Sequence, residues 1–211
     1  MSHVHVCLVS DQTIPNILGI YHFRPDSVLF ITTKGMEEKK KTLAILDTLS
    51  HLGLDYENKH VRIEVAEDSI LDCHSKIGAA VQEYGDAEYS VNLTTGTKIM
   101  SIATYDFFRD YGSKMIYIPI NRNEFITPFP KKAHIRSEPL NLRLSVIQYL
   151  AAYVLKVTNT EKLERYRKEA IDRKNLSKWI ADNYESIKNL LVWFGGILRN
   201  HMSSMCRLTY D

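Results

Sequence analysis

Five short runs of apolar, mostly β-branched residues alternate with helical patterns along the first 120 residues of this chain. The runs cover residues 3–10, 27–33, 61–66, 89–93 and 114–120, and the patterns between them predict helices over residues 15–23, 36–52, 68–84 and 97–111. The second run has no polar alternation until its end, which is typical of a strand covered on both faces. Strands separated by helices form βαβ units, so the sequence predicts an α/β fold with a doubly wound, mainly parallel sheet.

The pattern changes after residue 120. Residues 124–130 contain two prolines and form either an edge strand or a loop, residues 140–154 are predicted to be helical, and residues 160–191 form two charged helices. Residues 1–130 carry 12 Lys and Arg against 17 Asp and Glu, whereas residues 131–211 carry 15 against 8. We therefore expect a ligand-binding domain over residues 1–138 and a C-terminal helical extension over residues 139–211. The basic extension either contacts nucleic acid or an acidic partner, or is an ordinary solvated helical face.

Several classes of protein are disfavoured by what the sequence lacks. The three cysteines have no zinc-finger or redox spacing, so we expect reduced thiols and a cytoplasmic location. There is no signal-peptide pattern and no apolar run near the ~18 residues of a membrane span. His3 and His5 would need further ligands to hold a metal, and the other histidines show no matching spacing. We find no catalytic constellation and predict no metal and no cofactor.

Polar turns follow four of the five expected strands. They are residues 10–13, 32–34, 94–98 and 121–123. Because the carboxyl ends of parallel strands meet at one edge of a sheet, these turns should form a shared rim, which is where open α/β sheets bind ligands.

Residues 94–98, Thr-Thr-Gly-Thr-Lys, are the most informative of these turns. Unpaired N–H groups and the positive end of the following helix favour an anion there. Lys98 in the first helical turn opposes the helix dipole, a cost that a bound anion offsets. The alternative is a plain capped helix start. The turn is neither a P-loop nor a dinucleotide fingerprint, so it does not indicate ATP or NAD binding. In the first turn, the Gln12 amide can both donate to and accept from a base edge.

Three strings together resemble one known family. They are Leu-Val-Ser-Asp-Gln-Thr-Ile-Pro-Asn at residues 8–16, Thr-Thr-Lys at 32–34 followed by Glu-Glu-Lys at 37–39, and Asn-Leu-Thr-Thr-Gly-Thr-Lys-Ile-Met at 92–100. This combination is similar to the CARF (CRISPR-associated Rossmann fold) domain, in the branch fused to effectors of type III CRISPR defence. Residues 144–153 also resemble the helix that follows the sheet in that branch, so the likeness spans about residues 3–155.

The resemblance implies a Rossmann-like homodimer that binds cyclic oligoadenylate, of four or six units, across its two-fold axis and activates an attached effector, a nuclease or a deaminase. Some relatives cut the ring slowly, and others regulate transcription, so a ring nuclease and a DNA-binding regulator remain alternatives. Residues 156–211 match no effector, so we expect either a fragment whose effector lies in cis or helices that are themselves the output. The implied ligand-binding residues are Ser10, Asp11, Gln12, Thr13, Thr32, Thr33, Lys34, Thr94, Thr95, Gly96, Thr97, Lys98 and Asn121.

Overall fold

A computed structural model describes residues 1–119, 122–130, 134, 136–155, 158–190 and 192–193. The chain divides into two compact units, residues 1–157 and residues 158–211. We describe each unit by itself, and the functional boundary expected at residue 138 stays a prediction.

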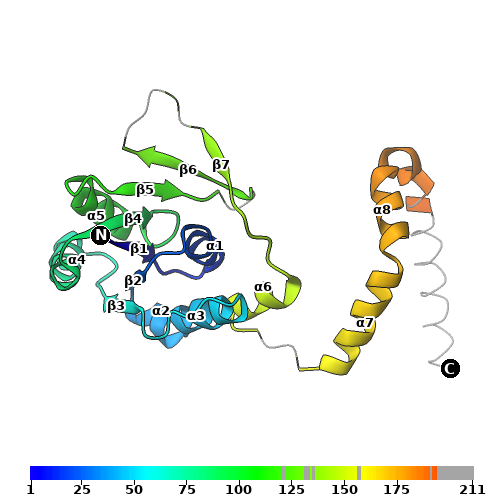
Figure 1. Ribbon diagram of the computed structural model, residues 1–211, viewed down its shortest axis with the longest axis horizontal. Coiled ribbons are helices and arrows are strands. Elements are labelled where there is room, and N and C mark those ends of the chain that lie inside the picture. Colours follow the sequence, from blue (N-terminus) through cyan, green and yellow to red (C-terminus); the bar gives the residue numbers. More distant parts are fainter. Residues whose placement is uncertain (120–121, 131–133, 135, 156–157, 191, 194–211) are drawn as a thin grey trace, which may run out of the picture. The chain divides into compact units, whose positions relative to one another are not determined.

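The described part of the first unit contains one sheet with the strand order β3-β2-β1-β4-β5-β6-β7 (Figure 1). Its strands are β1 (Ser2–Leu8), β2 (Ser27–Thr32), β3 (His60–Glu64), β4 (Ala87–Asn92), β5 (Lys114–Tyr117), β6 (Glu124–Phe129) and β7 (Ser137–Pro139). Pairing is parallel from β3 through β5, while β6 and β7 are antiparallel additions. The chain winds outward from β1 to β3 and then returns to β4 beside β1. The Rossmann-like, doubly wound prediction is therefore confirmed.

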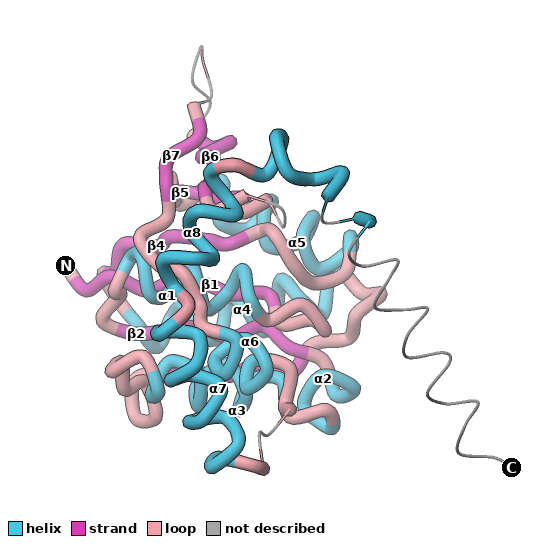
Figure 2. The backbone as a smooth tube through the Cα atoms, turned by 90° about the vertical axis from the view of Figure 1, so that its right-hand side faces the viewer, coloured by secondary structure: helices cyan, strands magenta, loops and turns pink. Residues whose placement is uncertain are grey.

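Helices cover both faces of the sheet (Figure 1 and Figure 2). They are α1 (Ile14–Phe23), α2 (Lys34–Glu38), α3 (Lys41–His51), α4 (Ile70–Tyr84), α5 (Lys98–Arg109) and α6 (Val146–Ala152). Alternate residues of β1 serve the two faces: Val4, Val6 and Leu8 pack with α4 and α5, whereas Cys7 packs with α1 and α3. The end of α6 joins this second layer through Ala152, which is fully buried.

The helix predicted over residues 36–52 is in fact two helices. Lys40 adopts a left-handed conformation, with φ of 57°, between α2 and α3. Lys39 and Lys41, which flank it, both form ion pairs with Asp11. Lysine is a good helix former, so local propensity does not predict this break.

The helix predicted over residues 140–154 begins later, at Val146. Ser145 caps it, and a reciprocal bond from Gln148 completes a capping box. Leu140 and Leu142 precede the helix and are buried against the sheet unit, where the Leu140 N–H donates to the Asn123 carbonyl. At residues 124–130 the strand alternative holds, as β6, although β7 rather than β6 forms the sheet edge.

The described part of the second unit is helical. It contains α7 (Thr160–Asp172) and α8 (Lys174–Asp182), and residues 184–190 are helical too, so the region predicted as two helices holds three helical segments. No helix in the described part of the chain is long and apolar enough to cross a membrane.

Candidate functional site

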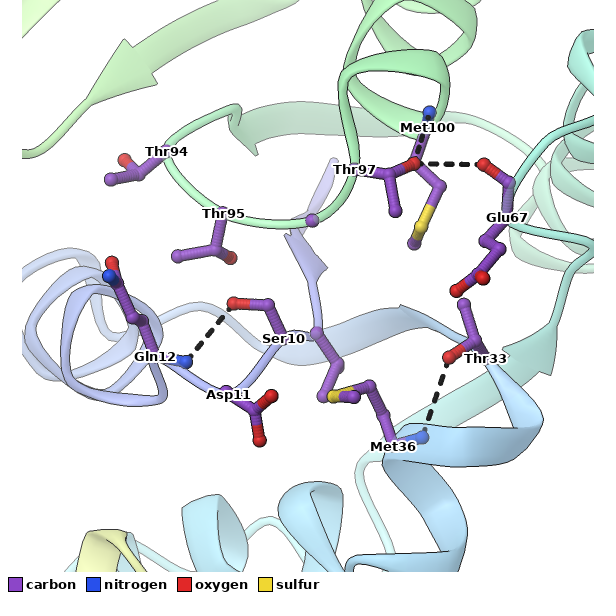
Figure 3. Close-up of a pocket in the computed structure, with 12 residues that line it drawn as sticks. Ser10, Asp11, Gln12, Thr33, Met36, Glu67, Thr94, Thr95, Thr97 and Met100 are labelled. Atoms are coloured by element: carbon purple, nitrogen blue, oxygen red, sulfur yellow. Dashed lines mark hydrogen bonds between the residues drawn. The ribbon is translucent and has the colours of Figure 1, made fainter.

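A pocket of about 390 Å³ lies at the carboxyl ends of β1, β2 and β4. Its walls come from the loop after β1, the start of α2, the segment after β3 and the loop between β4 and α5 (Figure 3). The connections of the sheet reverse between β1 and β4, and doubly wound sheets bind ligands at this switch point.

Eight of the thirteen residues predicted to bind ligand line this pocket. They are Ser10, Asp11, Gln12, Thr33, Thr94, Thr95, Gly96 and Thr97. Thr13, Thr32, Lys34 and Lys98 do not line it. Asn121 lies outside the described residues.

The threonine hydroxyls between β4 and α5 are used inside the protein. Thr94 donates to the Asn92 side-chain oxygen at 2.5 Å and accepts from the Ile118 N–H at 2.8 Å. Thr95 donates to the Leu8 carbonyl, and Thr97 donates to the Glu67 carbonyl at 2.9 Å. A hydroxyl has only one proton to donate, so these three side chains shape the loop rather than donating to a ligand.

Two buried asparagines link the ends of β1 and β4 to the start of α1. Asn92 donates to the Pro15 carbonyl at 3.1 Å and to the Asn16 side-chain oxygen at 3.2 Å. Asn16 in turn donates to the Leu8 carbonyl at 2.8 Å. Both side chains are fully buried, and such satisfied networks fix one geometry.

The loop backbone is left free to bind a ligand. Among the described residues, no group accepts a hydrogen bond from the backbone N–H groups of residues 95–99. Gly96, with φ of +87°, allows the turn, and Thr97 caps α5 by accepting from the Met100 N–H. Consecutive free N–H groups at a helix start form an anion site.

The loop after β1 combines a free donor with an ion-paired carboxylate. Ser10 accepts from the Gln12 N–H at 3.2 Å and keeps its own proton for a ligand. Asp11 pairs with Lys39 at 3.0 Å and Lys41 at 3.4 Å, and the hydrogen bond from Lys39 is the main reason why the Asp11 pKa is lowered. Thr13 is fully buried and donates to the Ala152 carbonyl at 2.6 Å, so its role is to hold α6.

The loop after β2 contributes only one of its three predicted residues to the pocket. Thr33 caps α2 by accepting from the Met36 N–H, which leaves its proton available. Thr32 is fully buried within the sheet. Lys34 and Lys98 are exposed first residues of their helices.

Four lining residues were not anticipated from the sequence: Val9, Met36, Glu67 and Met100. Glu67 could have been predicted, because it follows the third predicted strand and ligands bind at the carboxyl ends of parallel strands. The other three are apolar, and nothing in their local pattern distinguishes them from core residues.

The paired histidines of β1 lie within the sheet, away from the pocket lining. The Ser90 hydroxyl is 2.7 Å from His3 Nε2 and 2.6 Å from His5 Nδ1. Burial, with a smaller effect from His3, lowers the His5 pKa to about 3. Within the described residues, no three His, Cys, Asp or Glu side chains come together in a way that could hold a metal ion.

Solved structures with the same fold include three relevant proteins. Can2 from Sulfobacillus thermosulfidooxidans, solved with cyclic tetra-adenylate, has a TM-score of 0.63 and 22% identity over 82% of this chain and 48% of its own. VC1899 from Vibrio cholerae has a TM-score of 0.58 and 15% identity, over 71% of this chain and 39% of its own. A type III CRISPR defence DNA nuclease activated by cyclic oligoadenylate has a TM-score of 0.53 and 17% identity, over 72% of this chain and 23% of its own. The chain therefore spans less than half the length of each.

A comparison with curated proteins finds no match. The family model described as the Card1 CARF domain matches residues 4–149, a span that covers the parallel sheet, the pocket and most of α6. On this evidence, the chain belongs to the Card1 CARF domain family.

Proposed function

We propose that this chain is a cyclic oligoadenylate sensor of type III CRISPR antiviral defence that acts in the cytoplasm. The observation that carries the proposal is the row of free N–H groups at residues 95–99, placed at the switch point of the sheet. Phosphodiesters supply acceptors for these groups, and the Gln12 amide can pair with an adenine edge. Family membership and the cyclic tetra-adenylate held by Can2 support this choice of ligand.

A homodimer is part of the proposal. A pocket of about 390 Å³ is near the small end of the ~300–1,000 Å³ usual for small-molecule sites. A ring of four or six nucleotides is larger than a typical small molecule, so one subunit would hold only part of it. Leu71 on α4 and Ile102 on α5, which are 83% and 55% exposed, offer apolar surface on the two helices that begin beside the pocket. We propose that a second copy covers it.

Signal transmission to an effector in cis is the last part of the proposal. Two contacts link the pocket loop to the end of α6. The first is the hydrogen bond from Thr13 to the Ala152 carbonyl. The second runs through Lys41, which pairs with Asp11 and whose Nζ lies 5.7 Å from the centre of the Tyr153 ring. Lys41 is itself buried, so it cannot move without its partners. A ligand that repositions the loop would thereby act on α6.

Calorimetry with cyclic tetra-adenylate and cyclic hexa-adenylate tests the sensor. We expect one of the two rings to bind, with about one ring for every two chains. Absence of binding by both rings at micromolar protein concentrations would refute the function, and one ring for each chain would refute the shared site.

The exposed Lys98 at the first position of α5 is proposed to contact the ring phosphates from each subunit. Lys98→Ala should weaken binding and reduce its dependence on salt, because fewer charges are neutralised. Lys59→Ala is the matched control, since Lys59 is exposed and precedes β3 at the opposite end of the sheet. Equal effects of the two variants would exclude a specific contact by Lys98.

A further inference from the structure

Glu67 is a carboxylate in a pocket otherwise suited to an anion. Of the two acidic residues that line the pocket, Asp11 is ion-paired with two lysines. Among the described residues, Glu67 accepts a hydrogen bond only through its backbone carbonyl, and its exposed carboxylate has no hydrogen-bond or ion-pair partner. Figure 3 shows this side chain at the opposite end of the pocket from Gln12.

The Glu67 backbone is held in place by hydrogen bonds of the two preceding residues and of its own carbonyl. The Val65 N–H donates to the Thr32 carbonyl at 2.9 Å, and the Ala66 N–H donates to the Asp72 carboxylate at 2.7 Å. The Glu67 carbonyl accepts from Thr97 at 2.9 Å. The Glu67 side chain therefore extends from a fixed backbone at the edge of the pocket, and the backbone carbonyl of Glu67 is bonded to Thr97, the N-cap of α5.

The chemistry of a carboxylate restricts what it can contact in the ligand. An ionised carboxylate only accepts hydrogen bonds, and a phosphate beside it would be repelled. A cyclic oligoadenylate has two kinds of donor, the adenine amino group and the ribose 2′-hydroxyl. The 2′-hydroxyl is on the carbon next to the one that carries the 3′-phosphate, whereas the amino group is at the far edge of the base.

The position of Glu67 favours the ribose hydroxyl over the adenine amino group as its donor. Thr97 belongs to the row of free N–H groups that would hold a phosphate, and its hydroxyl donates to the Glu67 backbone carbonyl, so the two residues are neighbours. A donor within reach of both features is the hydroxyl adjacent to that phosphate. We propose that Glu67 accepts a hydrogen bond from a ribose 2′-hydroxyl and so selects a ribonucleotide ring over a deoxyribonucleotide ring. This inference rests on the proposed function and adds a specificity-determining residue to it.

The experiment is a cycle of two ligands and two proteins. The ring that binds in calorimetry and its all-2′-deoxy analogue are titrated into the wild-type chain and into Glu67→Ala. The wild type should prefer the ribose ring by roughly tenfold or more, and Glu67→Ala should bring this ratio close to one. Differences in sugar pucker between the rings affect both proteins equally and cancel. Glu67→Gln, which keeps an acceptor without the charge, should give an intermediate ratio.

Asp68→Asn is the matched control, because Asp68 is the next residue, equally acidic and exposed, but does not line the pocket. It should keep the wild-type ratio. An unchanged ratio in Glu67→Ala would overturn the inference, as would an equal loss of affinity for both rings, which would indicate contact with adenine. Tighter binding of both rings would also overturn it, because Glu67 would then only repel phosphate. In these cases the sensor function stands, whereas failure of both rings to bind the wild type would remove the function and the inference together.

Discussion

At the scale of single residues, the site depends on whether each polar side chain donates its proton within the protein or keeps it for a ligand. Thr94, Thr95 and Thr97 donate their protons within the protein, whereas no described group accepts from the backbone N–H groups of residues 95–99. The sequence correctly indicates that this turn is polar and glycine-containing. It does not reveal the direction of each hydroxyl, because Leu8 and Glu67, whose carbonyls accept two of these bonds, are distant in the chain.

Gly96→Ala should destabilise the protein. The new methyl group would lie 2.9 Å from Leu8 Cβ, at a backbone φ of +87°. Left-handed strain and overpacking together should lower the free energy of unfolding by roughly 2–4 kcal/mol. Urea-induced unfolding measures this change. In Gly35→Ala the added methyl group meets no atom within 4 Å, so this control should be neutral or slightly stabilising. A similar stability for the two variants would contradict the argument.

At the scale of elements, contacts between strands and helices change what local propensity suggests. The Ser90 hydroxyl on β4 joins His3 and His5 of β1, although these histidines carry no recognisable signal for such a link. The break between α2 and α3 is similar: it lies between Lys39 and Lys41, which both pair with the distant Asp11, and local propensity does not indicate it. By contrast, the start of α6 follows a local capping box. Helix boundaries that depend on residues nearby in the sequence are therefore easier to predict than those that local sequence does not mark.

The buried histidine should make stability fall in acid. The His5 pKa is about 3 in the folded protein against an ordinary value of 6.5, so the unfolded chain binds more protons between these values. The free energy of unfolding should therefore decrease as the pH falls below about 6.5, by up to ~1.4 kcal/mol per pH unit from this group. Burial lowers the pKa of His3 and His22 too, which adds to the slope with the same sign.

Denaturant unfolding from pH 7 to pH 4 checks this expectation. His5→Leu removes the titrating group. It should reduce the slope of the unfolding free energy against pH by up to the equivalent of one bound proton, whatever its effect on stability at pH 7. His51→Gln is the control, because it removes an exposed histidine of α3, and its slope should stay steeper than that of His5→Leu. A slope as steep in His5→Leu as in the wild type would exclude His5 as the cause.

At the scale of the whole molecule, the pocket is connected to α6, the last helix before the second unit in sequence. The loop that lines the pocket through Ser10–Gln12 also carries Thr13, which bonds to the α6 terminus across 139 positions of sequence. The loop therefore has two roles, in ligand contact and in packing. The first role is predictable from its place after a strand, but the second depends on where α6 docks.

Thr13→Val should weaken this connection while the pocket remains intact. It keeps the shape of Thr13 but removes its bond to Ala152. Hydrogen exchange of residues 146–153, with and without the bound ring, measures the effect. The ring should slow exchange in the wild type, and the variant should lose most of that change with an affinity within about threefold of the wild type.

Ser145→Ala serves as the control for this experiment. It removes the capping box and should speed exchange in α6 generally, but the response to the ring should persist. A full response in Thr13→Val would show that the signal does not travel through this bond.

The sheet class, the strand ends and the gathering of polar turns on one rim are predictable from the amino-acid sequence, and eight residues of these turns, implied by the family resemblance, line one pocket. These features follow from hydrophobic periodicity and from the rule that parallel strands end at a common edge, both of which are local or topological. Only the tertiary structure showed that the threonines point inward, that Thr13 holds α6, and that Glu67 lines the pocket. Those outcomes depend on which distant groups are close enough to exchange hydrogen bonds, and a linear pattern does not contain those distances.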